Sequence, residues 1–257
     1  MNADESRIAG NGDHTVVGLV NAVIRRVHAS VTFELLVPEF TVERGNFIAV
    51  IGDSGCGKST LLDLVGLILR PTACESFRFS SRGAASLIDV WELWQNGDEE
   101  SLAGLRRREL GYVLQTGGLI PFLSIEENIR LPLRLNGESR LTPRIDQLID
   151  ELEMRAYLPK KPAALSGGQR QRTAILRAMA HEPLLILADE PTAAVDKKRA
   201  QSIVGEFYRA IRRNQTAVVM VTHDHELVEE YCDAKYSFRL NQRSAHDTVS
   251  TCYRMES

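Results

Sequence analysis

No apolar run in this 257-residue sequence is long enough to cross a bilayer, which takes about 20 residues in a helix. The longest apolar runs, at residues 184–188 and 217–221, have the length of strands. The first 14 residues are polar and lack the basic and then apolar pattern of a targeting segment. We therefore expect a cytoplasmic protein that acts at a membrane only through a second, membrane-spanning polypeptide.

The sequence also has few cysteines and a small net charge. The spacing of Cys56, Cys74, Cys232 and Cys252 fits neither a zinc site nor a disulfide framework, so a reducing compartment is expected. The net charge is −3, without the basic excess that is typical of proteins that bind nucleic acid. The short basic run at residues 106–108 is interpreted as a solvated helix face. No nucleic acid partner is therefore expected.

What the sequence does contain is an alternation of short apolar segments with helical ones. Residues 16–50 are rich in valine, isoleucine, phenylalanine and threonine, which predicts several strands, mostly antiparallel. Residues 124–181 have apolar side chains at helical spacing between prolines. Buried strands are expected at 184–188 and 217–222, with a helix over 196–213 between them. This order predicts a parallel sheet with crossover helices.

The segment GDSGCGKST, residues 52–60, follows an apolar strand and precedes a helix. It matches G-x-x-x-x-G-K-[ST] at every fixed position, in the context that this phosphate-binding motif requires. Glycines let backbone N–H groups converge on a phosphate, and the helix N-terminus adds positive potential. Lys58 is expected to hold the β- and γ-phosphates of a nucleotide, and Ser59 to supply a hydroxyl to Mg²⁺. The predicted binding residues of the loop are Gly52, Asp53, Ser54, Gly55, Cys56, Gly57, Lys58, Ser59 and Thr60.

Two acidic residues, Asp189 and Glu190, follow the buried strand at 184–188. They lie at the edge of a parallel sheet where ligands bind, so Asp189 is predicted to hold Mg²⁺ and Glu190 to polarise an attacking water. A capping pair for the next helix is the alternative, which the complete phosphate loop disfavours. His223 ends the strand 217–222 and is predicted to contact a γ-phosphate from the same edge. A metal site at this histidine is disfavoured, since no further set of ligands is evident.

The segment LSGGQRQR, residues 165–172, is a second glycine-rich loop, and it raises the question of which phosphate it binds. GDSGCGKS, the strand end at Gln115, LSGGQ, LILADEP, the region of Asp196 and VTHD occur in the order of an ATP-binding cassette (ABC) ATPase, which the chain resembles over residues 16–240. The resemblance implies an α/β fold with a P-loop NTPase (RecA-like) core. It also implies a mixed sheet, an antiparallel β subdomain and a helical insert.

The resemblance implies a division of the chain as well. A flexible tail is expected at 1–14, an ABC ATPase domain at 15–240 and a C-terminal tail at 241–257. Within the domain, the catalytic core is expected at 15–115 and 182–240, and a helical signature subdomain at 116–181.

In this family two copies pack head to tail, and each lends its signature loop to the nucleotide of the other. The resemblance therefore implies that Ser166, Gly167, Gly168 and Gln169 contact the ATP that Lys58 of a second copy holds. It implies further that Gln115 senses Mg²⁺ and the attacking water, and that Asp196 communicates between the two sites. The implied cofactors are ATP and Mg²⁺, with Glu190, His223 and Gln115 as catalytic residues and Ser59, Gln115 and Asp189 as metal ligands.

The chain departs from the family pattern in two places. The family stacks adenine on an aromatic residue early in the chain, whereas residues 23–28 contain none, which leaves Arg26 or His28 to stack. The segment between the phosphate loop and Gln115 is longer than the family leads us to expect. Its extra residues, near 91–98, include two tryptophans, for which a partner contact and buried filling both stay open.

The sequence at 111–121, followed by EENI at 126–129 and LPL at 131–133, is similar to the lipoprotein-releasing and macrolide-exporter branch of the family. That branch pairs a short ATPase with a separate four-helix permease. The similarity implies a peripheral position on the cytoplasmic face of the inner membrane, through that permease. An envelope-signalling complex without cargo and a soluble non-transport ABC ATPase are the alternatives.

Overall fold

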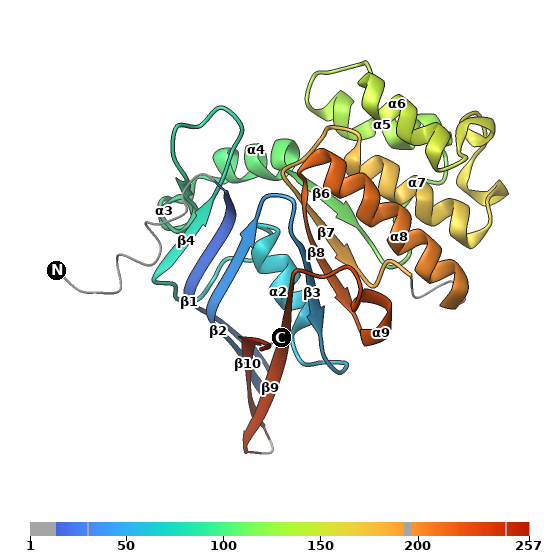
Figure 1. The fold of residues 1–257 in the computed structure, drawn as a ribbon. Helices are drawn as coiled ribbons and strands as arrows, with labels where there is room; N and C mark the ends of the chain where they lie inside the picture. Colours follow the sequence, from blue (N-terminus) through green and yellow to red (C-terminus); the bar gives the residue numbers. More distant parts are fainter. Residues whose placement is uncertain (1–13, 30, 193–196, 245, 257) are drawn as a thin grey trace.

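A computed structural model describes residues 14–29, 31–192, 197–244 and 246–256. The strands within these residues form one ten-stranded sheet in the order β5-β4-β1-β2-β10-β9-β3-β8-β7-β6 (Figure 1). One end of the sheet is parallel and the other mostly antiparallel, which confirms the predicted mixed sheet. No helix in this part of the chain has the length and apolar character that a bilayer span needs.

The parallel part of the sheet consists of β3 (Phe47–Ile51), β8 (Ala217–Thr222), β7 (Leu185–Asp189) and β6 (Leu110–Val113). All residues of β3 and β8 are buried, as expected for parallel strands that are covered on both faces. Because the four strands run in the same direction, their carboxyl ends meet at one edge. The segments that leave this edge carry the predicted site residues.

Helices cover both faces of the sheet and enclose two cores. The first face is covered by α2 (Lys58–Val65), α3 (Val90–Asn96) and α4 (Glu99–Glu109). The second face is covered by α5 (Ile125–Leu135), α6 (Pro143–Glu151), α7 (Gly167–Met179), α8 (Lys197–Asn214) and α9 (His225–Val228). Two 3₁₀ turns, η1 (Arg155–Tyr157) and η2 (Pro162–Ala164), lead from α6 to α7.

Both tryptophans of the longer segment lie in α3. Trp94 is only 6% exposed and belongs to the core under the first face, and Trp91 packs against the same core. The helix begins at Asp89, whose carboxylate accepts a hydrogen bond from the Glu92 backbone N–H. Of the two alternatives for these tryptophans, the structure therefore supports buried filling.

The rest of the sheet is built from two antiparallel hairpins, which pair with each other in parallel, and two short antiparallel strands at its outer edge. The first hairpin is β1 (Thr15–His28) with β2 (Val31–Glu43), and β4 (Ser76–Phe79) and β5 (Ile88–Asp89) extend the sheet beyond β1. The second hairpin, β9 (Ala234–Ser244) with β10 (Asp247–Arg254), inserts β10 between β2 and β9. Figure 1 shows it extending beside the first hairpin.

The second hairpin corrects the expectation of a C-terminal tail at 241–257. Residues 241–244 continue β9 and residues 247–254 form β10. Val249, Ser250 and Cys252 are buried in the sheet, although the segment is polar overall. Its alternating threonine, valine and tyrosine residues suit a strand, because such side chains fit a pleated surface. Residues 1–13 of the other expected tail lie outside the described residues.

The helices at 116–181 begin at clear capping residues. Ser124 and Glu127 form a reciprocal capping box at α5, and Thr142 caps α6 with Pro143 in its first turn. These signals fix where each helix starts.

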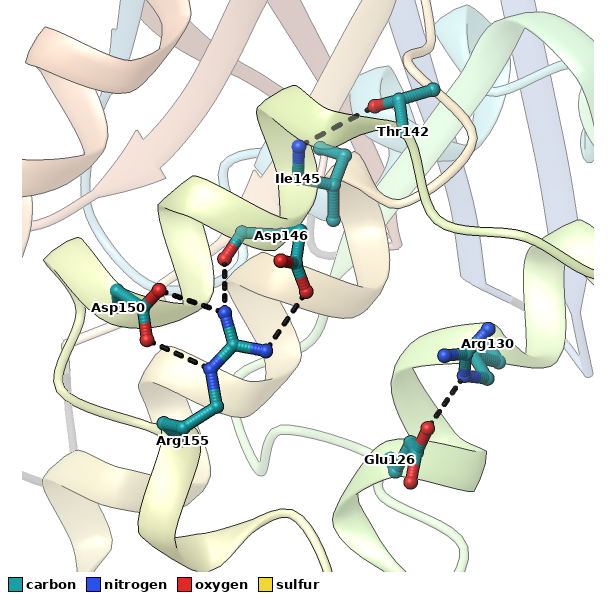
Figure 2. Close-up of polar contacts among 7 residues, drawn as sticks. All are labelled: Glu126, Arg130, Thr142, Ile145, Asp146, Asp150 and Arg155. Carbon is teal, nitrogen blue, oxygen red and sulfur yellow. Dashed lines mark hydrogen bonds and ion pairs between the residues drawn. The ribbon is translucent and has the colours of Figure 1, made fainter.

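A cluster of charges ties η1 back onto α6 (Figure 2). The Arg155 guanidinium donates to both carboxylate oxygens of Asp150, and to the carboxylate and the backbone carbonyl of Asp146, each at 2.8 Å. The same guanidinium lowers the pKa of both aspartates. The cluster thereby fixes the start of the connection that leads to the signature loop.

Candidate active site

A cleft of about 700 Å³ opens at the carboxyl edge of the parallel strands. The structure brings together in this cleft residues that are far apart in the sequence. It is lined by the phosphate-loop residues Ser54, Gly55, Gly57, Lys58, Ser59 and Thr60, by Gln115, Asp189, Glu190 and His223, and by Arg26 and Phe33.

The phosphate loop turns directly into α2. Gly57 caps this helix with a φ of +110°, a conformation that favours glycine because it has no Cβ. Lys58 is only 8% exposed, and its ammonium group donates to the carbonyl oxygens of Gly52 at 2.7 Å and Asp53 at 2.8 Å. The buried ammonium group of Lys58 thus adds to the positive potential at the N-terminus of α2. Both features favour the binding of an anion at this position.

Negative charge is crowded around Asp189, at the end of β7. Burial raises the pKa of this carboxyl group, and the neighbouring carboxylates Glu190 and Asp63 raise it further. Lys58 and a hydrogen bond with Ser59 act in the opposite direction and lower the pKa. The Asp189 carboxylate and the Ser59 hydroxyl therefore lie together at a position that would benefit from a further cation.

Gln115, Glu190 and His223 each follow the end of a strand, and the side chains of Gln115 and His223 approach the carboxylate of Glu190. One of its oxygens, Oε2, lies 3.5 Å from Nε2 of Gln115 and 3.4 Å from Nδ1 of His223. Glu190 has a φ of +43°, a left-handed conformation that costs energy for a residue with a side chain. Its backbone N–H is held by the carbonyl of Val221 on β8. Strained residues of this kind cluster at functional sites.

A protein-family model described as ABC transporter matches residues 36–193. The chain belongs to the ABC transporter family. This confirms the family membership that the motifs predict.

Two relatives within this family have similar length. The lipoprotein-releasing system ATP-binding proteins LolD of Aquifex aeolicus and Legionella pneumophila are 39% and 36% identical to this chain, each over 74% of the chain and 80% of the relative. A solved structure described as the dimeric post-hydrolysis state of the ATP-binding cassette MJ0796, bound to ADP and Pi, has a TM-score of 0.71. It is 30% identical, and the match covers 86% of this chain and 94% of that one. The fold is therefore that of an ABC cassette.

The signature loop of this ABC cassette lies outside the cleft that its own phosphate loop lines. Ser166 caps α7 in a capping box with Gln169, with hydrogen bonds of 2.9 and 3.3 Å, and it is exposed. Ser166, Gly167, Gly168 and Gln169 are not among the described residues that line the cleft. The remaining predicted site residue, Asp196, lies outside the described residues.

Phe33 is an aromatic residue of the cleft that none of the sequence motifs indicates. Phe33 lies on β2 directly opposite Arg26 on β1, and a Cβ on Gly57 would lie 3.3 Å from its ring. The Arg26 guanidinium lies 3.9 Å from the Asp63 carboxylate of α2, whereas His28 does not line the cleft. Only the pairing register of β1 with β2 could have indicated Phe33, because the family pattern places the aromatic residue on the first strand.

Proposed function

We propose that this protein is the ATP-hydrolysing subunit of a membrane transport complex and that it works as a head-to-tail dimer. The observation that carries the proposal is the convergence of Lys58, Asp189, Glu190, Gln115 and His223 on one cleft. These residues supply phosphate binding, a metal ligand and water-orienting groups. Phosphoryl transfer requires little else, because its catalysis is mostly positioning and charge neutralisation.

Each residue of the cleft has a role that follows from its position. Lys58 exchanges the carbonyl oxygens that it now contacts for the β- and γ-phosphate oxygens of ATP, at the positive end of α2. Glu190 accepts a hydrogen bond from the attacking water and polarises it. Gln115 and His223 both approach the same oxygen of this carboxylate, Oε2, and both orient the water and the γ-phosphate.

The cleft fits a magnesium ion. The Ser59 hydroxyl and the Asp189 carboxylate lie together, and oxygen atoms of this kind are the ligands that Mg²⁺ prefers. Burial, and after it the neighbouring carboxylates Glu190 and Asp63, raise the pKa of Asp189, and a divalent cation would neutralise this negative charge. Ser59, Asp189 and the side-chain oxygen of Gln115 would hold the ion. A bound magnesium ion would neutralise negative charge on the phosphates.

The signature loop requires a second copy of the chain. Ser166 is exposed and Gly167 and Gly168 are half-buried at the N-terminus of α7, a 13-residue helix whose first N–H groups can bind phosphate. We infer that Ser166, Gly167, Gly168 and Gln169 bind the γ-phosphate of ATP that the second copy holds, with Asp196 between the two sites. The dimeric state of the similar MJ0796 cassette supports this arrangement.

A groove of about 420 Å³ is the candidate docking site for the transmembrane permease. It lies between the catalytic core and the helical segment 116–181, which we propose as the signature subdomain. Leu131, Pro132 and Leu135 of α5 provide an apolar wall, and Arg107 of α4 a charged rim. Arg177 lines the groove and donates to the carbonyls of Gly117 and Gly118, in the loop that follows Gln115. A partner in the groove can thus sense the catalytic loop.

We propose that the permease is of the lipoprotein-releasing or macrolide-exporter type and that it holds this subunit at the cytoplasmic face of the inner membrane. The LolD relatives, named as parts of a lipoprotein-releasing system, support this branch. The cargo is set by the permease, so the cleft itself carries no information about it.

The test of this function is phosphate release by the purified protein and its Glu190→Gln variant. The wild type should hydrolyse ATP only with Mg²⁺, and Glu190→Gln should bind ATP yet turn over at least about 100-fold more slowly. A variant that hydrolyses at the wild-type rate would contradict the role of Glu190.

The same variant, with ATP bound, can be purified from detergent-solubilised membranes of the source organism. A four-helix permease should co-purify, and Leu135→Arg should abolish its recovery while ATP binding persists. A permease of another helix number would overturn the branch, and recovery that is unaffected by Leu135→Arg would overturn the groove.

A further inference from the structure

The C-terminal hairpin contacts the phosphate loop from behind. Ser250 on β10 is fully buried, and its hydroxyl donates a 2.5 Å hydrogen bond to the carbonyl oxygen of Cys56. Cys56 lies in the middle of the phosphate loop and is itself only 2% exposed. Both partners are removed from water, so bulk solvent does not readily replace this bond if the hydroxyl is lost.

The hydrogen bond fixes the orientation of the peptide between Cys56 and Gly57. In a planar trans peptide the C=O and the N–H point in opposite directions. Since the Cys56 carbonyl points toward β10, the Gly57 N–H points away from β10, to the side of the loop where Gly57 lines the cleft. Glycine tolerates many backbone conformations, so this peptide needs an external contact to keep one orientation.

Neighbouring strands hold Ser250 in place on both sides. In the sheet Ser250 pairs with Leu35 of β2 and Leu240 of β9. Phe238 of β9 packs against the start of the same loop, because a Cβ on Gly52 would lie 3.2 Å from its ring and 2.7 Å from Sγ of Cys56. The loop therefore lies against a surface that the C-terminal hairpin provides.

We propose that Ser250 is a positioning residue of the nucleotide site, which holds the phosphate loop with the Gly57 N–H directed at a phosphate before the nucleotide binds. The proposal rests on the proposed function, because it names what sets the affinity of that same site. Ser250 acts through the Cys56–Gly57 peptide and does not touch the nucleotide. Its loss should therefore weaken ATP and ADP binding by a similar factor.

The test is a titration of fluorescent ATP and ADP analogues, with Mg²⁺, into wild type, Ser250→Ala and Val249→Ala. Ser250→Ala should raise both Kd values about 3- to 10-fold, the loss expected for one buried hydrogen bond. Val249 is the matched control, because it is 4% exposed and neighbouring side chains of a strand point to opposite faces. Val249→Ala should lower the melting temperature while both Kd values stay within about twofold of wild type.

The comparison separates positioning from a general loss of stability. A Ser250→Ala protein that melts at a lower temperature but binds both analogues as tightly as wild type would overturn the proposal. So would a Kd increase of equal size in Val249→Ala. If Ser250→Ala does not fold, Ser250→Cys, whose thiol is a weaker donor, is titrated under reducing conditions and judged by the same criteria. A wild-type protein that binds neither analogue would instead contradict the proposed function itself.

Discussion

Phe33 supplies an aromatic surface to the cleft at a position where the first strand has none. Its ring lies beside Gly57 of the phosphate loop and opposite Arg26, so a base that extends from phosphates bound at this loop meets an aromatic face and a guanidinium. Both groups bind the face of a base without reading its hydrogen-bonding edge. The cleft should therefore hold purine nucleotides with little preference between adenine and guanine.

We predict that Phe33→Ala weakens ATP binding at least about fivefold, because stacking on an aromatic side chain contributes about 1–3 kcal/mol per base. Binding of inorganic tripolyphosphate, which has no base, should not change. Competition titrations against a fluorescent nucleotide measure both. His28→Ala, at an exposed position of the same strand pair, is the control and should bind ATP as wild type does. An equal loss of affinity for ATP and for tripolyphosphate would mean that Phe33 supports the phosphate loop and does not contact the base.

The contrast between Lys58 and Phe33 shows which site residues a sequence can predict. Lys58 and its neighbours follow one another in the chain, so a local motif with a physical reason for each residue identifies them. Phe33 reaches the cleft only through its pairing with Arg26, and Ser250 only through the insertion of β10 beside β2. Such registers depend on tertiary packing, which no local pattern records.

At the scale of elements, the Arg155 cluster is a small unit with a defined pH response (Figure 2). We predict that Arg155→Gln lowers the melting temperature at pH 7, since it removes four hydrogen bonds between η1 and α6. Arg155 holds the pKa of Asp146 and Asp150 below the usual aspartate value of 3.8. Groups with a lowered pKa stabilise the folded state above the unfolded-state value, and this stabilisation is lost as the pH falls through the folded-state value.

The difference in melting temperature between wild type and Arg155→Gln should therefore be constant from pH 7 to about pH 5 and shrink below about pH 4. Thermal denaturation followed by circular dichroism at several pH values measures it. Arg130→Gln, which breaks one ion pair with Glu126 on α5 and one hydrogen bond to the Ser139 carbonyl, is the control and should have a smaller effect at pH 7. A difference that grows on acidification would contradict the assigned cause.

The C-terminal hairpin is the element that was not predicted from the sequence, and we predict that its truncation prevents folding. A chain that ends at Ser244 loses β10, which separates β2 from β9 in the middle of the sheet. Two strands are then left with unpaired edges, and the sheet loses the buried side chains of Val249 and Cys252. We expect no soluble protein with a cooperative melting transition. A chain that ends at Arg254, and so keeps β10 whole, should fold and melt close to wild type.

Across the whole molecule, a chain of contacts joins the groove to the site of hydrolysis. Arg177 contacts the groove and the carbonyls of the loop after Gln115, and Gln115 contacts Glu190. Helix α7, which lines this groove with Arg177 in its last turn, begins at Ser166. We therefore expect that movement of this segment, when it binds a partner, changes two things together: the position of Gln115 in its own cleft and the position of the signature loop that a second copy would contact.

The dimer makes a prediction that no single-copy mechanism makes. Lys58→Ala removes the phosphate contact of a chain, and Ser166→Arg removes its signature loop, so each variant alone should be inactive. In a mixed dimer one site combines both defects, whereas the other combines the intact phosphate loop of the Ser166→Arg chain with the intact signature loop of the Lys58→Ala chain. Random mixing in equal amounts should thus restore up to about a quarter of wild-type ATP hydrolysis. Two chains that act independently, each with its own signature loop, would remain inactive at every mixing ratio, and phosphate release measured across those ratios decides between the two arrangements.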